Sequence, residues 1–185
     1  MRIISGTLKG RRFTPPTKLK ARPTTDFAKE GLFNVLGGKI DLEGIKVLEL
    51  FSGSGSIGLE FVSRGAESVI GIEISMQHIG YIKKVCSELD VKNYFLQKAD
   101  VFKYLEVAKG SYDVVFADPP YAIKDLDKIP DLILNNNLLS EDGLLILEHG
   151  RDYDFSAHPN FLEMRKYGNV HFSFFANAKK SSLLN

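Results

Sequence analysis

Residues 112–121 read YDVVFADPPY, and this stretch decides the fold that the surrounding sequence is expected to adopt. The run 114–116 is apolar, with β-branched and aromatic side chains, which is typical of a strand buried on both faces of a parallel sheet. Two prolines follow Asp118, and because proline has no N–H and a fixed φ, a strand cannot continue through them. The sequence therefore predicts a buried parallel strand that ends in a rigid turn at Asp118.

The turn after this strand carries groups that suit an exocyclic amine of a nucleobase. Ligands of open α/β sheets bind at the carboxyl ends of the strands, where this turn is expected to lie. The Asp118 carboxylate and the Pro119 carbonyl can accept the two N–H bonds of such an amine, while the Tyr121 ring stacks on the base. We therefore expect Asp118, Pro119 and Tyr121 to be catalytic. Pro120 and Tyr121 are expected to contact the substrate. The alternative is a proline-rich strand end with a solvated aspartate.

Short apolar runs alternate with helical segments on both sides of this stretch. Strands are expected at residues 47–51, 68–73, 94–96, 112–117 and 143–148, and helices at residues 57–64, 75–89, 102–108 and 126–135. Two more strand-like runs, 161–167 and 170–176, are joined by Gly168-Asn169, a signal of a tight turn. We predict an α/β fold with a doubly wound, mostly parallel sheet, which the terminal hairpin extends by an antiparallel strand.

The first 40 residues differ from the rest in pattern. Residues 2–5 and 11–14 read as two short strands of a small hairpin, and a helix with a threonine cap is expected after a basic loop. We therefore expect residues 1–40 to form a basic hairpin and helix extension, and residues 41–185 to form the catalytic domain.

Charge is distributed unevenly along the chain. Residues 1–30 carry eight lysines and arginines against two acids, a balance of +6, whereas the remaining residues have a balance of −5. A basic arm on a mildly acidic body indicates that one end of the protein docks on a polyanion. We expect Arg11, Arg12 and Arg22 to contact the substrate, and the alternative is a solvated basic tail.

Composition limits the class of protein further. A chain of 185 residues fits one domain, and its hydrophobic share of 44% is enough for a core. Cys86 is the single cysteine, which excludes a disulfide framework and a cysteine zinc site, and we expect no metal. Neither a signal peptide nor an apolar run of about 18 residues is visible, so the expected location is the cytoplasm, without a membrane partner.

The segment ELFSGSGSIG, residues 49–58, joins the first expected strand of the sheet to its helix. Its glycines have the G-x-G-x-x-G spacing, which dinucleotide-binding enzymes also use to hold a pyrophosphate at a helix N-terminus. Glu49 precedes the glycines, and its charge would repel a pyrophosphate but attract the sulfonium and amino groups of S-adenosylmethionine. We therefore expect S-adenosylmethionine as the cofactor. The residues of this segment expected to bind it are Glu49, Phe51, Ser52, Gly53 and Gly55.

Two further acids follow expected strands and complete the predicted cofactor site. Glu73 ends the second strand about 20 residues after the glycines, where an acid can accept both ribose hydroxyls. Asp100 follows the third strand, where it can accept from the adenine amino group while Val101 offers a backbone N–H to the ring. The alternatives are a surface acid at Glu73 and a helix N-cap at Asp100, although capping and binding can coexist. Asp118 is expected to face the cofactor as well as the target amine.

Other polar residues near strand ends receive a plainer interpretation. Glu148 and His149 end the fifth strand and are interpreted as a strand-end pair without a catalytic role. His78 and Cys86 lie on a helical segment and are interpreted as packing or surface residues.

Five segments together resemble a known family. They read RIISGTLKGRR, ARPTTDFAKEGLFNVL, LELFSGSGSIGLE, DPPY and RKYGNVHFSFF, and they span nearly the whole chain. In these segments the chain resembles the RsmD-type 16S ribosomal RNA guanine-N2 methyltransferases. The glycine loop and DPPY occur in many amine methyltransferases, whereas the two N-terminal segments narrow the resemblance to this one family. Phe27 and Lys29 stand where many relatives carry arginine, and Asn169 stands where relatives carry aspartate.

The resemblance implies a class I methyltransferase fold, Rossmann-like, with a seven-stranded sheet. It also implies that S-adenosylmethionine is the methyl donor and that one guanine N2 amine of 16S rRNA is the acceptor. The implied partner is an assembling 30S subunit or a late assembly intermediate, and we expect the protein to be a monomer.

Three alternatives remain open at this stage. The acceptor amine could belong to adenine N6 or to a protein glutamine. A nicotinamide oxidoreductase would use the same glycine loop but has no use for DPPY. A non-catalytic RNA-binding factor would use the basic arm but need not retain Glu49, Glu73 and Asp118 together.

Overall fold

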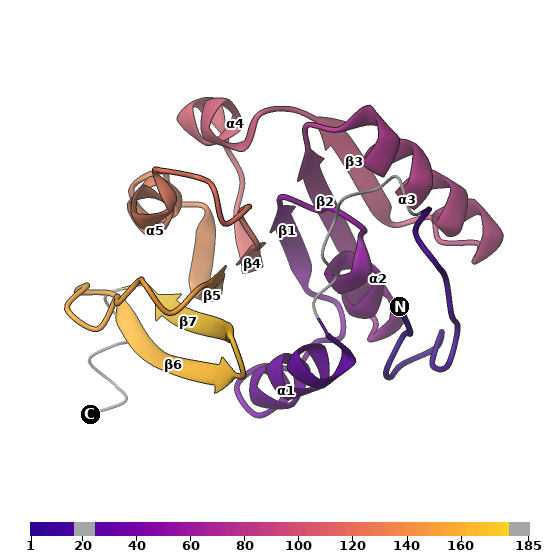
Figure 1. Ribbon diagram of the computed structural model, residues 1–185, viewed down its shortest axis with the longest axis horizontal. Helices are drawn as coiled ribbons and strands as arrows, with labels where there is room; N and C mark the ends of the chain where they lie inside the picture. The colour runs from indigo at the N-terminus through magenta and orange to yellow at the C-terminus, as the bar shows by residue number, and fades with distance from the viewer. Residues whose placement is uncertain (17–24, 178–185) are drawn as a thin grey trace.

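A seven-stranded sheet with the strand order β3-β2-β1-β4-β5-β7-β6 runs through the middle of the protein (Figure 1). The computed structural model describes residues 1–16 and 25–177. Strands β1 to β5 are parallel, and β7 is antiparallel to both of its neighbours. The strands are β1 (Lys46–Leu50), β2 (Ser68–Glu73), β3 (Tyr94–Lys98), β4 (Tyr112–Ala117), β5 (Leu139–His149), β6 (Phe161–Tyr167) and β7 (Val170–Ala176).

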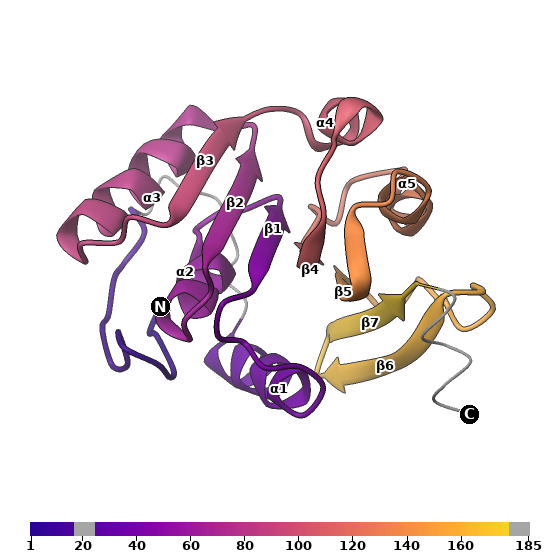
Figure 2. The ribbon, with the colours of Figure 1, turned by 180° about the vertical axis from the view of Figure 1, so that it is seen from behind.

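Helices cover both faces of the sheet, so each face has its own apolar core. The helices are α1 (Asp26–Gly37), α2 (Ser56–Ser63), α3 (Met76–Glu88), α4 (Val101–Val107) and α5 (Ile129–Asn135). Apolar side chains of α1, α2 and α3 share one buried cluster with the sheet, and those of α4 and α5 share the other. Figures 1 and 2 show α3 alongside β3 and α1 beside β6, near opposite ends of the strand order. The predicted doubly wound α/β fold is confirmed.

Two elements differ from those expected by more than a shift of one or two residues at their ends. Strand β5 begins at Leu139, four residues before the expected start, and its pairing with β4 shifts register between Tyr112 and Val114. The expected helix over 126–135 is divided into a 3-10 turn at Leu126–Lys128 and α5. Because Pro130 has no N–H to donate to the carbonyl of residue 126, the α-helical ladder cannot extend back through it.

The expected N-terminal hairpin is present but short. Its arms pair through an antiparallel bridge between Arg2 and Arg12, and the Ile3 N–H donates to the Arg11 carbonyl at 3.0 Å. The pairing stops after Ile3 because helix α2 takes the next hydrogen bonds of the first arm. The N–H groups of Ile4 and Ser5 donate to the Glu60 carboxylate at 2.8 and 3.0 Å. Gly6 lies against the same helix with a φ of +83°, and a Cβ there would lie 1.7 Å from the Ser63 carbonyl oxygen.

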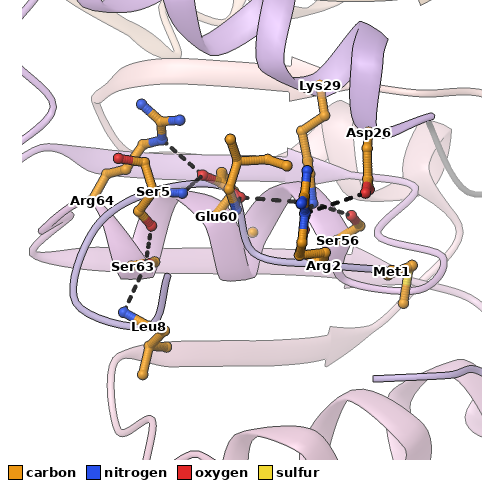
Figure 3. A network of polar contacts seen from close by, with 12 residues as sticks. Met1, Arg2, Ser5, Leu8, Asp26, Lys29, Ser56, Glu60, Ser63 and Arg64 are labelled. Atoms are coloured by element: carbon orange, nitrogen blue, oxygen red, sulfur yellow. Dashed lines mark hydrogen bonds and ion pairs between the residues drawn. The ribbon is translucent and has the colours of Figure 1, made fainter. Parts of the chain in front are cut away.

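Lys29 shows why the charge of the N-terminal segment was overestimated from the sequence. Its side chain on α1 is fully buried, and its ammonium donates to the Arg2 carbonyl at 2.6 Å and to Ser56 Oγ at 3.1 Å (Figure 3). Its Nζ also lies 3.7 Å from Glu60 Oε2, which is likewise buried. Burial lowers the pKa of Lys29, and the nearby Glu60 opposes that effect. This lysine therefore joins the N-terminal segment to α1 and α2 and is not available to a polyanion.

The proposed division of the chain at residue 40 stays a prediction. Ile3 and the apolar residues of α1 belong to the same buried cluster as the sheet, so the N-terminal segment packs on the sheet. Residues 17–24, which include Arg22, lie outside the described part of the chain.

We predict that Lys29→Met destabilises the protein by about 3–5 kcal/mol, because it leaves the buried Glu60 without its cationic partner. The measurement is the free energy of unfolding in urea. The control is Lys84→Met, which breaks the exposed pair of Lys84 with Glu88 on α3 and should change stability by no more than about 0.5 kcal/mol. Equal effects of the two substitutions would contradict the structural role of Lys29.

Candidate active site

A cavity of about 620 Å³ opens at the carboxyl ends of β1, β2, β3 and β4. It is lined by segments that follow these four strands, as expected for ligand sites of open α/β sheets. The expected site residues among its lining are Glu49, Phe51, Ser52, Gly53, Glu73, Asp100, Val101, Asp118, Pro119, Pro120 and Tyr121. Gly55, Arg11 and Arg12 are not among the lining residues.

The N–H groups of the three glycines in the loop are already bonded to the protein. Gly53 donates to Glu73 Oε2 at 2.8 Å, Gly55 donates to the Ser52 carbonyl at 2.7 Å, and Gly58 donates to Glu49 Oε1 at 2.8 Å. A pyrophosphate needs free N–H groups at such a loop. Two of these three groups instead bind carboxylates. The loop is therefore held by Glu73 and Glu49 and is unsuited to a dinucleotide.

Gly55 has a packing role that the sequence did not reveal. It precedes α2 in the left-handed conformation with a φ of +72°, and a Cβ at this position would lie 2.9 Å from the Ile82 side chain. The glycine therefore allows the loop to lie close to α3, and it does not line the cavity.

Glu49 is 2% exposed and lies beneath the glycine loop. Its carboxylate accepts hydrogen bonds from the Gly58 N–H and from the Tyr94 hydroxyl. Burial raises the pKa of Glu49 to about 7, although these hydrogen bonds favour the ionised form. A cation in the cavity would favour the ionised carboxylate again, so Glu49 suits a positively charged ligand.

Glu73 ends β2, and its carboxylate is held by backbone groups on both sides. It accepts from the N–H groups of Gly53 and Ser75, each at 2.8 Å. His78, interpreted from the sequence as a packing or surface residue, also lines the cavity, with its Nδ1 3.5 Å from Glu73 Oε2. A sequence signal existed, because Ser75 caps α3 directly after β2 and places the first turn of α3 at the strand end.

Asp100 combines the two roles considered for it in the sequence. Its side chain caps α4 by accepting from the Lys103 N–H at 3.1 Å, and the same residue lines the cavity. Val101 follows as the first residue of α4 and is 4% exposed. Phe51 lies across the cavity with an unusual φ of +60°, and its ring meets that of Phe102 edge to face at 6.4 Å.

The turn after β4 places Asp118 inside the cavity and Tyr121 at its mouth. The Asp118 N–H donates to the Leu50 carbonyl at 3.4 Å, and the Ile123 N–H closes the turn on the Pro120 carbonyl at 2.9 Å. The Tyr121 side chain is 59% exposed and lies against Gly150, where a Cβ would be 3.4 Å from the ring. An exposed ring beside a half-buried carboxyl group is the arrangement that a stacked base with an exocyclic amine requires.

Asp118 has an unusual proton affinity for an aspartate. Desolvation raises its pKa well above the ordinary value, and the neighbouring carboxyl groups of Glu148 and Glu49 raise it further. The cavity lining contains the four acids Glu49, Glu73, Asp100 and Asp118 and, among the described residues, no lysine or arginine. These acids fit the sulfonium and amino groups of the expected cofactor, and they would repel a pyrophosphate.

Arg11 and Arg12 are exposed on the N-terminal segment. In the described part of the chain, no helix has the length and apolar character needed to span a membrane. The same residues contain no group of three or more histidine, cysteine, aspartate or glutamate side chains placed to hold a metal ion.

Comparison with known proteins gives one family and several named relatives. A family model described as "Conserved hypothetical protein 95" matches residues 1–176. "Ribosomal RNA small subunit methyltransferase D" of Buchnera aphidicola (subsp. Baizongia pistaciae) is 32% identical over 96% of this chain and 92% of its own length. "Putative rRNA methyltransferase YlbH" of Bacillus subtilis is 35% identical over 83% of this chain and 85% of its own length.

Solved structures agree with the fold. The "Putative methyltransferase yhhF" of Escherichia coli superposes with a TM-score of 0.82 at 28% identity, covering 96% of this chain and 98% of that one. The "putative methylase HI0767" of Haemophilus influenzae superposes with a TM-score of 0.76 at 28% identity, covering 95% and 97%. A putative SAM-dependent methyltransferase of Streptococcus mutans has a TM-score of 0.64 at 19% identity, over 79% of this chain and 48% of that one, and supports the fold alone.

We predict that Gly58→Ala weakens binding of S-adenosylmethionine and destabilises the protein by about 1–3 kcal/mol, as overpacking does. The new Cβ would lie 2.6 Å from the Tyr94 ring and 2.7 Å from Glu49 Oε2, so it would displace both groups beneath the loop. Calorimetry and urea unfolding measure the two effects. The control is Gly80→Ala on α3, where the added Cβ would meet no atom within 4 Å beyond its own helix backbone and chain neighbours, and about 0.4–1 kcal/mol of stabilisation is expected. Unchanged binding in Gly58→Ala would contradict the role of this close contact.

Proposed function

Because this chain belongs to the RsmD family of rRNA methyltransferases, we propose that it methylates the exocyclic N2 amine of one guanine in 16S rRNA, within an assembling 30S subunit. The observation that supports this proposal is the position of the Asp118–Tyr121 turn. It brings a carboxyl group and an exposed ring to an acidic cavity that suits a cationic donor.

The donor site is assigned to the residues that line the cavity. S-adenosylmethionine supplies an electrophilic methyl group carried on a positively charged sulfur. Glu49 and Asp118 compensate its positive charges, Glu73 accepts the ribose hydroxyls, and Asp100 with the Val101 N–H binds the adenine. Phe51, Ser52 and Gly53 belong to the glycine loop and form the part of the cavity wall that faces the donor.

The acceptor site is assigned to the turn after β4. Asp118 and the Pro119 carbonyl accept the two N–H bonds of the amine, which favours a pyramidal nitrogen and stabilises the positive charge that develops on it. Tyr121 stacks on the guanine, and Pro120 holds the turn rigid beside it. These residues position the amine for direct in-line attack on the methyl carbon.

We assign the binding of RNA outside the active site to two exposed arginines of the N-terminal segment, Arg11 and Arg12. Arg22 is a further candidate from the sequence. A late assembly intermediate of the 30S subunit is the proposed partner. We also propose that the protein acts as a monomer in the cytoplasm.

The first test of this proposal is Asp118→Ala, which we expect to lower turnover by about 10²–10³, as loss of one preorganised hydrogen-bonding group does. Donor affinity should fall far less, because Glu49, Glu73 and Asp100 remain. Asp118→Asn should be milder, since its amide oxygen still accepts. Methyl transfer to small subunits from cells that lack the activity and calorimetric donor binding are measured in parallel. Near-normal turnover, or loss confined to donor binding, would refute the assignment.

The second test is charge reversal at Arg11 and Arg12. It should weaken binding to 16S rRNA particles and flatten its salt dependence, since each lost phosphate contact lowers the log–log slope by about 0.7–0.9. The control reverses the charge of Lys46, the first residue of β1, and of Lys109, which precedes β4. Both lysines are exposed and lie at the end of the sheet opposite the cavity. The proposal fails if both pairs of substitutions change the slope equally.

A further inference from the structure

One large aromatic side chain is exposed in the first turn of helix α1. The Phe27 ring is 72% exposed, more than any other aromatic residue in the described part of the chain. A single exposed apolar side chain is common on protein surfaces and by itself indicates nothing. What matters is how this ring is held and what lies around it.

Phe27 is the outermost member of a row of aromatic rings that leads to the cavity. Its ring meets that of Tyr167 edge to face, with centroids 5.7 Å apart, and Tyr167 is tilted against Phe172 at 5.9 Å. Phe172 in turn packs on Phe116 at 6.3 Å. Both inner rings are buried, and Phe116 lines the cavity. The exposed ring therefore rests on a rigid part of the molecule.

Gly31 makes this arrangement possible. Helix α1 lies beside β6 (Figure 1), and a Cβ at Gly31 would lie only 2.1 Å from the Tyr167 ring. The ring of Tyr167 therefore packs directly on the helix backbone, in a fixed position under Phe27. In an edge-to-face pair at least one face of the Phe27 ring stays uncovered by its partner. We call Phe27 and Tyr167 the aromatic platform.

The aromatic platform lies at the same end of the sheet as the cavity. Tyr167 pairs with Val170, where β6 turns into β7. Strand β7 is antiparallel to β5, and His171 near its start lies opposite His149 at the carboxyl end of β5. The β6–β7 turn is therefore beside the end of β5, at the end of the sheet where the neighbouring parallel strands open into the cavity.

A short polar segment connects the cavity mouth with the β6–β7 turn. Gly150 follows β5 and lies against the Tyr121 ring, which is exposed at the mouth. The next residue, Arg151, donates from its guanidinium to the side chain of Asn169, which lies in the turn. The surface is therefore continuous from the proposed acceptor site to the turn that carries Tyr167.

Cations lie at both ends of this surface. Arg2 is held beside the platform by Asp26, with 3.6 Å between Arg2 Nε and Asp26 Oδ2, and it bridges to Arg12 through the backbone. None of the ion pairs between described residues includes Arg151. The exposed acids nearest in the chain are Glu30 and Asp152. The ring of the platform is thus a neutral stacking surface between two positively charged groups.

The surroundings of the ring favour a nucleotide over a protein partner. The other large apolar side chains that are exposed among the described residues are Ile74, Met76, Phe95, Val107 and Tyr121. None of them lies on α1, β6 or β7. The centre of a protein interface needs a contiguous apolar patch, which one ring does not provide. A single aromatic ring beside arginines is instead the usual platform for an unpaired base, whose phosphates the cations bind.

We propose that the aromatic platform stacks an unpaired base of the RNA close to the target nucleotide, while Arg151 and Asn169 hold the backbone between the platform and Tyr121. The protein then selects a target whose neighbouring nucleotides are not all paired. The identity of this RNA as 16S rRNA rests on the proposed function, whereas the stacking of an unpaired base is a property of the platform itself.

Tryptophan fluorescence measures the stacking directly. The chain contains no tryptophan, so Phe27→Trp introduces a single indole at the platform. Because a stacked base quenches indole fluorescence, we expect saturable quenching by a single-stranded RNA of mixed sequence at low salt, and by small subunits from cells that lack the methylation. The matched control is Phe95→Trp, on β3 at the other edge of the sheet, where the native ring is 56% exposed. Its fluorescence should not change, and inorganic polyphosphate should quench neither variant.

A series of substitutions separates stacking from other apolar contacts. Phe27→Ala and Phe27→Leu should each weaken binding to small subunits by about 5- to 150-fold, the contribution of one base–aromatic stack, whereas Phe27→Tyr should keep the native affinity. None of the three should change the salt dependence, since stacking releases no counterions. Arg151→Ala should lower the log–log slope by about 0.7–0.9. Calorimetry should find donor binding unchanged in all four variants.

Equal quenching of the two tryptophan variants, quenching by polyphosphate, or native affinity in Phe27→Ala would overturn the inference. Native affinity in Phe27→Leu would overturn it as well, because a contact with another protein or with another part of this chain needs only an apolar side chain. Failure of the proposed function has a different signature. The wild-type protein would then not methylate 16S rRNA, yet the single-stranded RNA would still quench Phe27→Trp.

Discussion

The hydrogen bonds between the glycine loop and the acids at the ends of β1 and β2 are the interactions on which the rest of the site depends. Glu49 holds the loop through Gly58, and Glu73 holds it through Gly53. A loop with this spacing commonly offers its N–H groups to phosphate. Here the same groups are used internally, so the loop becomes a wall of an acidic cavity, and the ligand chemistry changes from anionic to cationic without a change of fold.

Helix α2 connects this wall to the N-terminal segment. Its first residue, Ser56, lines the cavity and binds Lys29, while Glu60 and Ser63 further along bind the backbone of residues 4–8. A buried ammonium and a buried carboxylate are costly unless every partner is present. The position of the segment that carries Arg11 and Arg12 is therefore fixed relative to the cavity by a short and fully buried connection.

The sequence predicted the strands and the cavity acids well because their signals are local. The bounds of β2, β4, β6 and β7 follow from runs of apolar residues and turn signals, and residues such as Glu73 and Asp118 stand directly after strands. What it missed depends on contacts between distant segments. The N-terminal hairpin is shorter than expected because Glu60 accepts the N–H groups of Ile4 and Ser5, and Lys29 is buried against a helix that begins 27 residues later. Gly55 and His78 show the same limit, since their roles depend on how α3 packs.

The position of β7 has a consequence for how the protein is made. Strand β7 lies between β5 and β6, so the outer edge of β5 has no partner until residue 176 has been synthesised. Before that point a growing chain exposes a long apolar edge strand, next to the strand ends that will form the catalytic wall. Translation must therefore deliver almost the whole described sequence before the sheet is complete. A chain that stops short, or pauses late, presents that edge to other chains and is at risk of aggregation.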